Sequence, residues 1–299
     1  MKKLPLVFSG CLLGLAGAGN LVLDTLPVLS HLLSLSGLIL WLFFLILHLF
    51  NWEETKQELI KPPLLSGMAT FPMAGMILST YVFHLLPHFS LVAQGIWWFS
   101  FLLDLTLIAT FTIKFACPGR RVNATPSWTV LYVGIAVAAL TYPLVGIIEI
   151  AYATLIFGFV LTFYLYPLIY SDLKKHPLPM ALLGQEGIYC APFSLLLASI
   201  VRVGGAGLPT WLLIVMILAS QSFFFFVLTR LPHILKRGFQ PAFSALTFPT
   251  IITATSLKMA QGILRLPFLD YLVLAETVIC LTILFFVLVG YLIWLRKKV

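Results

Sequence analysis

Nearly every charge in this chain of 299 residues lies in a short gap between long apolar runs. Hydrophobic residues make up 61% of the sequence and charged residues only 9%. A helix that crosses a bilayer needs about 20 mostly apolar residues in a row. Its backbone must also satisfy its own hydrogen bonds, because the hydrocarbon offers none. The pattern therefore predicts an all-α integral membrane protein.

Ten apolar runs are long enough to serve as membrane spans. They begin near Leu4, Val28, Leu64, Leu91, Ser127, Ile147, Leu183, Thr210, Pro241 and Leu269. The longest polar stretch between them is the expected loop from Asn51 to Pro63. Ten spans leave little of the chain outside the membrane, so we expect residues 1–299 to form a single transmembrane domain without a soluble domain.

The basic residues predict how the chain is oriented. Cytoplasmic loops of membrane proteins carry an excess of Lys and Arg. Three of the 18 basic residues, Arg202, Lys258 and Arg265, fall on one side of the ten-span arrangement. The others fall on the opposite side and are Lys2, Lys3, Lys56, Lys61, Lys114, Arg120, Arg121, Lys174, Lys175, Arg230, Lys236, Arg237, Arg296, Lys297 and Lys298. We therefore expect both termini to be cytoplasmic.

The net charge of +8 does not indicate nucleic-acid binding. It is spread over short segments and forms no contiguous basic face, which nucleic-acid binding would require. The lipid bilayer is the expected neighbour of these residues, and the plasma membrane is the expected location.

Odd-numbered spans are rich in glycine and proline, and even-numbered spans mostly are not. The odd spans contain Gly10, Gly14, Gly17, Gly19, Pro72, Gly134, Pro143, Pro192 and Pro249. Proline removes a backbone hydrogen bond and bends a helix, and the freed carbonyl must face protein or water. We expect the kinked odd helices to surround a central path, with straighter even helices outside. The alternative is that glycine and proline are simply common in membrane helices.

A short motif recurs in the odd spans. Thr70-Phe71-Pro72 in the third span returns as Thr247-Phe248-Pro249 in the ninth, and Ala191-Pro192-Phe193 lies in the seventh. A tripeptide can recur by chance in so apolar a chain, so the position of these motifs in kinked spans carries the argument. Residues expected to line the path or to kink its helices are Gly10, Gly14, Phe71, Pro72, Pro143, Pro192, Phe193 and Pro249.

These residues resemble those of a known family. The ninth span runs from Phe239 to Pro249 as FQPAFSALTFP. It is similar to that of the tellurite-resistance/dicarboxylate transporter family, which includes bacterial tellurite-resistance proteins, yeast malate and sulfite permeases and plant slow anion channels. Agreement extends over essentially the whole chain through Leu4-Pro5 followed by Gly10 and Gly14, Pro126-Ser127 and Ala191-Pro192.

The resemblance implies a fold of five helical hairpins in a quasi-fivefold array, with the odd helices lining a pore. It also implies a homotrimer with one pore in each protomer. A phenylalanine plugs the pore at mid-membrane in this family, and it corresponds to Phe248. The function implied is passive anion permeation through a central pore gated by that phenylalanine.

The expected path contains no basic residue at mid-depth. Selection of an anion would then depend on backbone dipoles at the kinks, on pore width and on hydroxyl groups. The candidate hydroxyls are Ser9, Thr70, Thr141, Ser194 and Thr247. The alternative for each is a hydrogen bond back to its own helix.

Acidic residues within the spans support a second reading. Asp104, Glu149, Glu186 and Glu276 have no obvious basic partner in the sequence, and acids in membranes commonly relay protons. The alternative function is therefore a proton-coupled carrier of C4-dicarboxylates, sulfite or related oxyanions. Asp104 and Glu276 lie on even spans, where structural roles are favoured. Glu186 lies on an odd span near the cytoplasmic mouth and is the candidate modulator of permeation.

No sequence motif indicates an enzyme. The chain lacks the motifs GxSxG, GxGxxG, HExxH and the Walker loop, so we expect no catalytic residues, no cofactor and no metal site. A membrane scaffold would be favoured by polar residues clustered on one membrane face, which the sequence does not show. The expected partners are small inorganic or organic anions.

Overall fold

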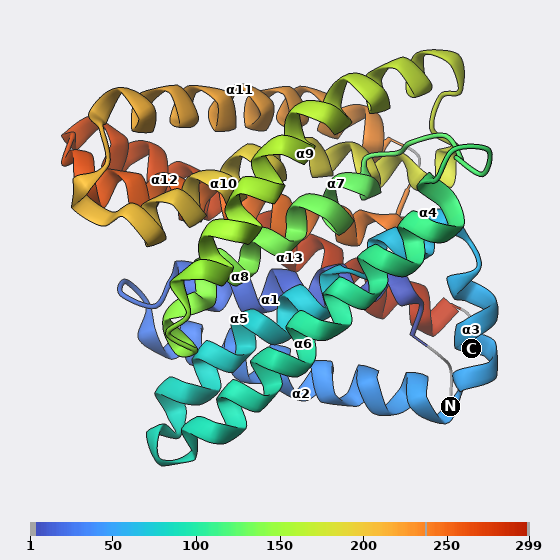
Figure 1. Ribbon diagram of the computed structural model, residues 1–299, viewed down its shortest axis with the longest axis horizontal. Helices are drawn as coiled ribbons and strands as arrows, with labels where there is room; N and C mark the ends of the chain where they lie inside the picture. The colour runs from blue at the N-terminus through green and yellow to red at the C-terminus, as the bar shows by residue number, and fades with distance from the viewer. Residues whose placement is uncertain (1–3, 237, 298–299) are drawn as a thin grey trace.

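The computed structural model describes residues 4–236 and 238–297, and these are arranged as long, closely packed helices (Figure 1). Lys2, Lys3, Arg237 and Lys298 lie outside the described residues. Five segments are composite, each made of two or more short helices: η1 (Leu6–Phe8) with α1 (Ser9–Leu21), α4 (Pro62–Gly67) with α5 (Thr70–Leu85), α7 (Ser127–Val133) with η4 (Gly134–Ala136) and α8 (Val137–Thr141), η6 (Met180–Cys190) with α10 (Ala191–Gly204), and η8 (Pro241–Leu246) with α12 (Thr247–Leu264).

Between the composite segments lie five long, continuous helices. They are α2 (Pro27–Phe50), α6 (Ser90–Phe111), α9 (Ile148–Lys175), α11 (Thr210–Leu235) and α13 (Pro267–Lys297). The structure also contains α3 (Trp52–Leu59), where the polar sequence predicts a loop. Glu53 and Glu54 in its first turn and Lys56 in its last suit the helix dipole, which explains why this polar stretch is helical.

Eight helical stretches within the described residues are long and apolar enough to cross a membrane. The stretch Leu6–Leu21 is apolar but shorter. The remaining segment, α12, is more polar, because it carries Lys258 and Gln261 beside several hydroxyl side chains. A multi-pass membrane protein is therefore supported, and the crossing of the membrane at all ten segments stays a prediction.

The composite segments lie inside the molecule and the continuous helices lie outside. In the inner stretches 62–85, 127–144 and 180–207, between 61% and 72% of the residues in the most apolar 18-residue part are buried. In the five continuous helices the corresponding share is 28% to 39%. Almost every residue of α1 is buried as well. This burial agrees with the inner and outer positions expected from the glycine and proline content.

Contacts between helices join the inner segments to one another. Each inner segment packs against the outer helix that follows it, as α1 does against α2 and α12 against α13. Among the inner segments, α1 contacts α5, α5 contacts α8, α8 contacts α10, α10 contacts α12, and α12 contacts α1. The inner segments therefore form a closed circuit of contacts. The quasi-fivefold symmetry of this circuit is implied by the family resemblance and not by the residues alone, and it stays a prediction.

The prolines of the inner segments lie where a new helix begins. Pro72 and Pro249 are the third residues of α5 and α12, and Pro192 is the second residue of α10. Proline is tolerated in a first turn because its missing N–H would have no helical partner there. These three prolines therefore lie where each inner segment passes from one short helix to the next. Pro143 lies in the short helix η5 (Tyr142–Leu144).

Both ends of the described chain lie at the same end of the molecule. The start of α1 and the end of α13 lie together at the right in Figure 1, near α3. The inner segments all begin at this end, which also carries Lys174 and Lys175 at the end of α9. The opposite end carries Arg202 and Lys258. That the first of these ends faces the cytoplasm stays a prediction.

Candidate permeation pathway

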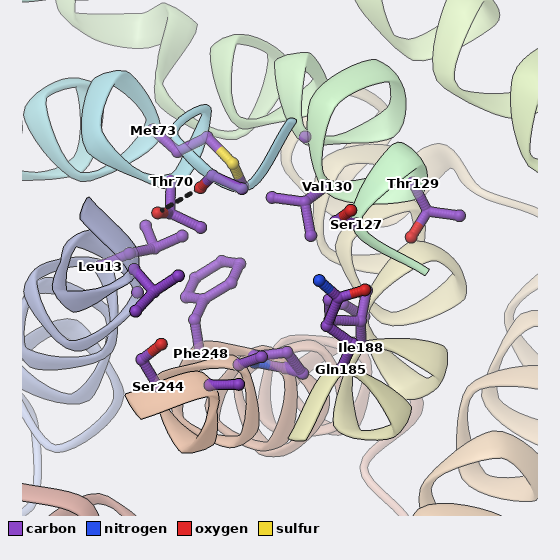
Figure 2. Close-up of a pocket in the computed structure, with 18 of the residues that line it drawn as sticks. Leu13, Thr70, Met73, Ser127, Thr129, Val130, Gln185, Ile188, Ser244 and Phe248 are labelled. Atoms are coloured by element: carbon purple, nitrogen blue, oxygen red, sulfur yellow. Dashed lines mark hydrogen bonds between the residues drawn. The ribbon is translucent and has the colours of Figure 1, made fainter. Parts of the chain in front are cut away.

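A cavity of about 70 Å³ opens between the five inner segments at the end where they begin. Each segment contributes to its wall, as Leu13, Met73, Val130, Ile188 and Phe248 show (Figure 2). Its lining is mostly apolar. A space of this size can hold a few water molecules. We call it the inner cavity.

A second cavity, of about 580 Å³, lies toward the opposite end of the same five segments. Its wall is more polar and includes Asn20, Thr80, Thr141, Arg202 and Lys258. Lys258 donates to the carbonyl oxygen of Leu21 and forms an ion pair with Asp24 at 2.9 Å. Arg202 is exposed to solvent. We call this space the outer cavity.

A closed layer separates the two cavities at one depth on every inner segment. The inner cavity ends at Leu13, Met73, Gly134, Leu195 and Pro249, and the outer cavity begins at Asn20, Thr80, Leu140, Arg202 and Thr255. Each interval is six or seven residues, which is a rise of about 10 Å along a helix. Every residue between these limits is buried. The structure therefore shows two cavities in line, with a packed layer between them.

Phe248 lies at the inner edge of this layer. Its side chain is only 4% exposed, and Figure 2 shows the ring projecting from α12 into the middle of the inner cavity. The ring packs against Gly17 of α1, where an added Cβ would lie 3.2 Å from Cδ2 of Phe248. By contrast, Phe243 on η8 does not line the cavity and packs edge-on against Phe239 at 5.5 Å between ring centroids.

The structure brings several other expected residues to the path. Gly10, Pro192 and Pro249 line the inner cavity, and Pro143 lines the outer cavity. Gly14 faces α12, where an added Cβ would lie 2.7 Å from Oγ1 of Thr247. Glycine at this position therefore allows α1 and α12 to approach closely.

Two residues expected to line the path, Phe71 and Phe193, line neither cavity and contact outer helices. Phe71 stacks on Trp41 of α2 with 4.9 Å between ring centroids, and its carbonyl oxygen accepts a hydrogen bond from Trp41 Nε1. Phe193 stacks on Phe223 of α11 at 5.4 Å. Pro72, next to Phe71, is buried and also does not line either cavity. Outer helices cover both aromatic rings.

The candidate hydroxyls of the path already donate their protons to protein. Thr70 donates to the carbonyl oxygen of Gly67, and Thr141 to that of Val137. Ser9, Ser194 and Thr247 also donate to carbonyl oxygens, at 2.8, 2.6 and 2.7 Å. Ser9 and Thr70 are also bonded to each other at 2.7 Å. A hydroxyl has one proton to donate, so each of these five protons is already used within the protein.

Glu186 has a basic partner, contrary to the sequence-based expectation. Arg230 of α11 donates to both carboxylate oxygens of Glu186, at 2.9 and 3.1 Å. The pair lies beside a separate groove of about 360 Å³ that includes Tyr189 and His233. Glu186 does not line the inner cavity. Its effect on permeation stays a prediction.

The other membrane acids lie away from both cavities. Asp104 of α6 and Glu276 of α13 are buried, and their carboxylate oxygens have no hydrogen-bond partner within residues 4–236 and 238–297. Glu149, at the start of α9, is exposed. None of the three lines the inner or the outer cavity.

Gln185 lines the inner cavity although no sequence motif singled it out. Its side chain is buried, and its amide oxygen has no partner among the described residues. The signal that could have found it is a spacing of three residues within η6, which requires knowing that this stretch is a 3₁₀ helix and not an α-helix.

Comparison with protein families gives one match that spans nearly the whole chain. Residues 3–292 match the family model described as SLAC1, voltage-dependent anion channel. A search of curated proteins finds no match. The family match covers all five inner segments and both cavities.

Proposed function

The chain belongs to the SLAC1 family of voltage-dependent anion channels, and we propose that it lets anions pass through the space enclosed by its five inner segments. The observation that carries this proposal is the pair of cavities in line, separated on every inner segment by five or six buried residues. This arrangement suits a pore that is closed by a thin layer.

We propose Phe248 as the gate of this pore. A hydrophobic constriction blocks ions by excluding water, and the Phe248 ring projects into the inner cavity at the edge of the closed layer. The ring comes from the first turn of α12, where the 3₁₀ helix η8 passes directly into the α-helix. A stretch of 3₁₀ helix within a longer helical segment often marks a hinge.

The positions of the membrane acids support a channel over a carrier. Proton coupling would be simplest if a titratable group faced the transported anion. Asp104 and Glu276 instead belong to outer helices and line neither cavity. The carrier of C4-dicarboxylates, sulfite or related oxyanions remains the second candidate, because two buried carboxyl groups without partners among the described residues are uncommon and intramembrane acids often relay protons.

Measurement of anion flux in proteoliposomes separates the two candidates. We expect a passive channel to give a reversal potential that follows the anion gradient and is the same at two pH values. A carrier would give saturable uptake driven by a proton gradient. Uptake that requires the proton gradient would replace the channel proposal with the carrier. Absence of any anion flux would contradict both.

We further propose the plasma membrane as the location, cytoplasmic termini, and a homotrimer. The orientation is supported by basic residues such as Lys174 and Lys175, because the end of α9 that carries them lies at the same end of the molecule as both described chain ends. The trimer is supported by the resemblance alone. Cross-linking in mild detergent is expected to give a species of three chains, and a particle that is strictly monomeric would contradict it.

A further inference from the structure

Gln185 is one member of a row of side chains that runs along the wall of the inner cavity. Leu182, Gln185, Ile188 and Ala191 all line this cavity, at intervals of three residues. A 3₁₀ helix has three residues per turn, so side chains three apart lie on one face. Helix η6 is of this type over Met180–Cys190. The row is apolar except for Gln185.

The two other faces of η6 are held by neighbouring helices, which fixes the direction of Gln185. Gly184 and Gly187 face η8, where an added Cβ at Gly187 would lie 2.6 Å from Cδ2 of Leu246. Glu186 and Tyr189 form the third face, toward α11, through the ion pair of Glu186 with Arg230. The remaining face, which carries Gln185, must therefore point into the cavity.

The amide of Gln185 has no hydrogen-bond partner among the residues that the structure describes. Its side chain is 94% buried, since its exposed fraction is 6%. No hydrogen bond of its amide joins any residue that the structure describes, and its oxygen is fully enclosed. Figure 2 shows the end of this side chain directed into the space opposite the Phe248 ring. A buried amide without a partner costs free energy unless a ligand or water satisfies it.

The other polar side chains of the inner cavity mostly have partners. Thr129 donates to the carbonyl oxygen of Pro126, Thr70 donates to that of Gly67, and Ser127 is bonded to Ser66 at 2.7 Å. Ser244 adds one hydroxyl to the wall beside Phe248. An amide supplies two N–H donors. Gln185 is therefore the strongest group in this cavity that can still donate a hydrogen bond.

We infer that the Gln185 amide binds a small monovalent anion, such as chloride or nitrate, in the inner cavity on the side of Phe248 where the inner segments begin. This inference rests on the proposed function and names the residue that selects its substrate. A neutral donor suits a conducting site, because an ion must bind well enough to enter and weakly enough to leave. A cation in the same place would hold the anion more strongly.

Conductance of matched variants in planar bilayers tests the inference in a Phe248→Ala background, where we expect an open pore. Gln185→Leu keeps the size of the side chain and removes both donors. We expect about a tenfold fall in conductance at low chloride, as expected for the loss of one hydrogen bond to an ion. Gln185→Asn keeps an amide and is expected to retain part of the conductance.

Gln221→Leu is the matched control. Gln221 of α11 is also a buried glutamine, and it lies beside Glu276 of α13, but it lines neither cavity. We expect this variant to conduct like its background. Equal conductance of the Gln185→Leu and Gln221→Leu variants would overturn the role of Gln185 while leaving anion permeation intact.

A binding measurement keeps the inference testable if the background variant does not conduct. Chloride that binds the folded protein raises its melting temperature. We expect replacement of gluconate by chloride at constant ionic strength to stabilise the wild-type protein and the Gln221→Leu variant, and to stabilise the Gln185→Leu variant less. Equal chloride stabilisation of all three proteins would overturn the inference without reference to conduction. Absence of anion current in every protein would instead contradict the proposed function.

Discussion

The ring of Phe248, in the last inner segment, lies directly against Gly17 in the first. Because Gly17 has no side chain, it leaves room for the ring. An added Cβ at Gly17 would lie 3.2 Å from Cδ2 and 3.3 Å from Cε2 of the Phe248 ring. These distances are shorter than ordinary van der Waals contact between carbon atoms. The absence of a side chain at Gly17 therefore permits the observed position of the ring.

Gly17→Ala is expected to destabilise the protein through this contact. Overpacking of a buried site costs about 1–3 kcal/mol, and the better helix propensity of alanine returns up to about 1 kcal/mol. A double-mutant cycle with Phe248→Ala isolates the contact, because the propensity term is the same in both backgrounds. We expect the fall in melting temperature to be smaller when Phe248 is alanine. An equal fall in both backgrounds would show that the ring does not depend on Gly17.

The pair formed by Glu186 and Arg230 is expected to contribute modestly to stability. The Arg230 side chain is 41% exposed and the Glu186 side chain 14%, so solvent screens part of the attraction. We expect Glu186→Gln to lower the free energy of unfolding by about 1 kcal/mol, toward the upper range for exposed pairs. Arg230→Gln should lower the free energy of unfolding by a similar amount, and the double variant should lower it by little more than either single variant.

The same Glu186→Gln variant tests the expected role of Glu186 in permeation. Because the carboxylate is paired with Arg230 and does not line the inner cavity, we expect anion conductance to stay the same. A changed conductance at unchanged stability would establish Glu186 as a modulator that acts from outside the pore.

Orientation is tested by cysteine labelling with a membrane-impermeant reagent. Cys11, Cys190 and Cys280 are buried, and Cys117 is partly exposed. The substitution Cys117→Ser therefore removes the native thiol that the reagent could reach. In that variant, Lys175→Cys is expected to react only from the cytoplasm, and Ser90→Cys only from outside. Reaction of both positions from the same side would contradict the ten-span arrangement.

Neutralising the buried acids is expected to leave passive permeation unchanged. Asp104 and Glu276 line neither cavity, so Asp104→Asn and Glu276→Gln should retain the anion conductance of the parent protein. Proteoliposome flux with and without a pH gradient provides the measurement. Loss of gradient-driven uptake in either variant would favour the proton-coupled carrier.

Patterns spread over the whole chain predicted the architecture well, whereas the direction of single side chains could not be predicted. The motif Thr-Phe-Pro illustrates the difference. Thr70 begins α5 and Thr247 begins α12, so both copies have the same local structure. Yet Phe71 stacks on Trp41 of an outer helix, and Phe248 points into the inner cavity. The rotation of each helix about its axis depends on tertiary packing and is not encoded in three residues.

The type of helix also limited what could be predicted from the sequence. An α-helix has 3.6 residues per turn, so the side chains of Leu182, Gln185, Ile188 and Ala191 would drift around its axis and would not share one face. The 3₁₀ geometry of η6 keeps this row together along the cavity, with Gln185 in it and Glu186 directed to α11. An interpretation based on charge therefore selected Glu186 and overlooked its neutral neighbour.

Replacement of Phe248 provides the decisive test of the gate. If its ring closes an otherwise continuous path, Phe248→Ala should remove most of the side chain, allow water to fill the gap and raise anion conductance markedly. A residue with only a packing role would instead leave a cavity that costs about 3–5 kcal/mol, with a lower melting temperature and no added current. Phe243→Ala is the matched control, because Phe243 is buried within the same inner segment but does not line the cavity. We expect it to lose stability without gaining current. If Phe248→Ala and Phe243→Ala both leave the anion conductance unchanged, or both raise it equally, Phe248 is not a specific gate.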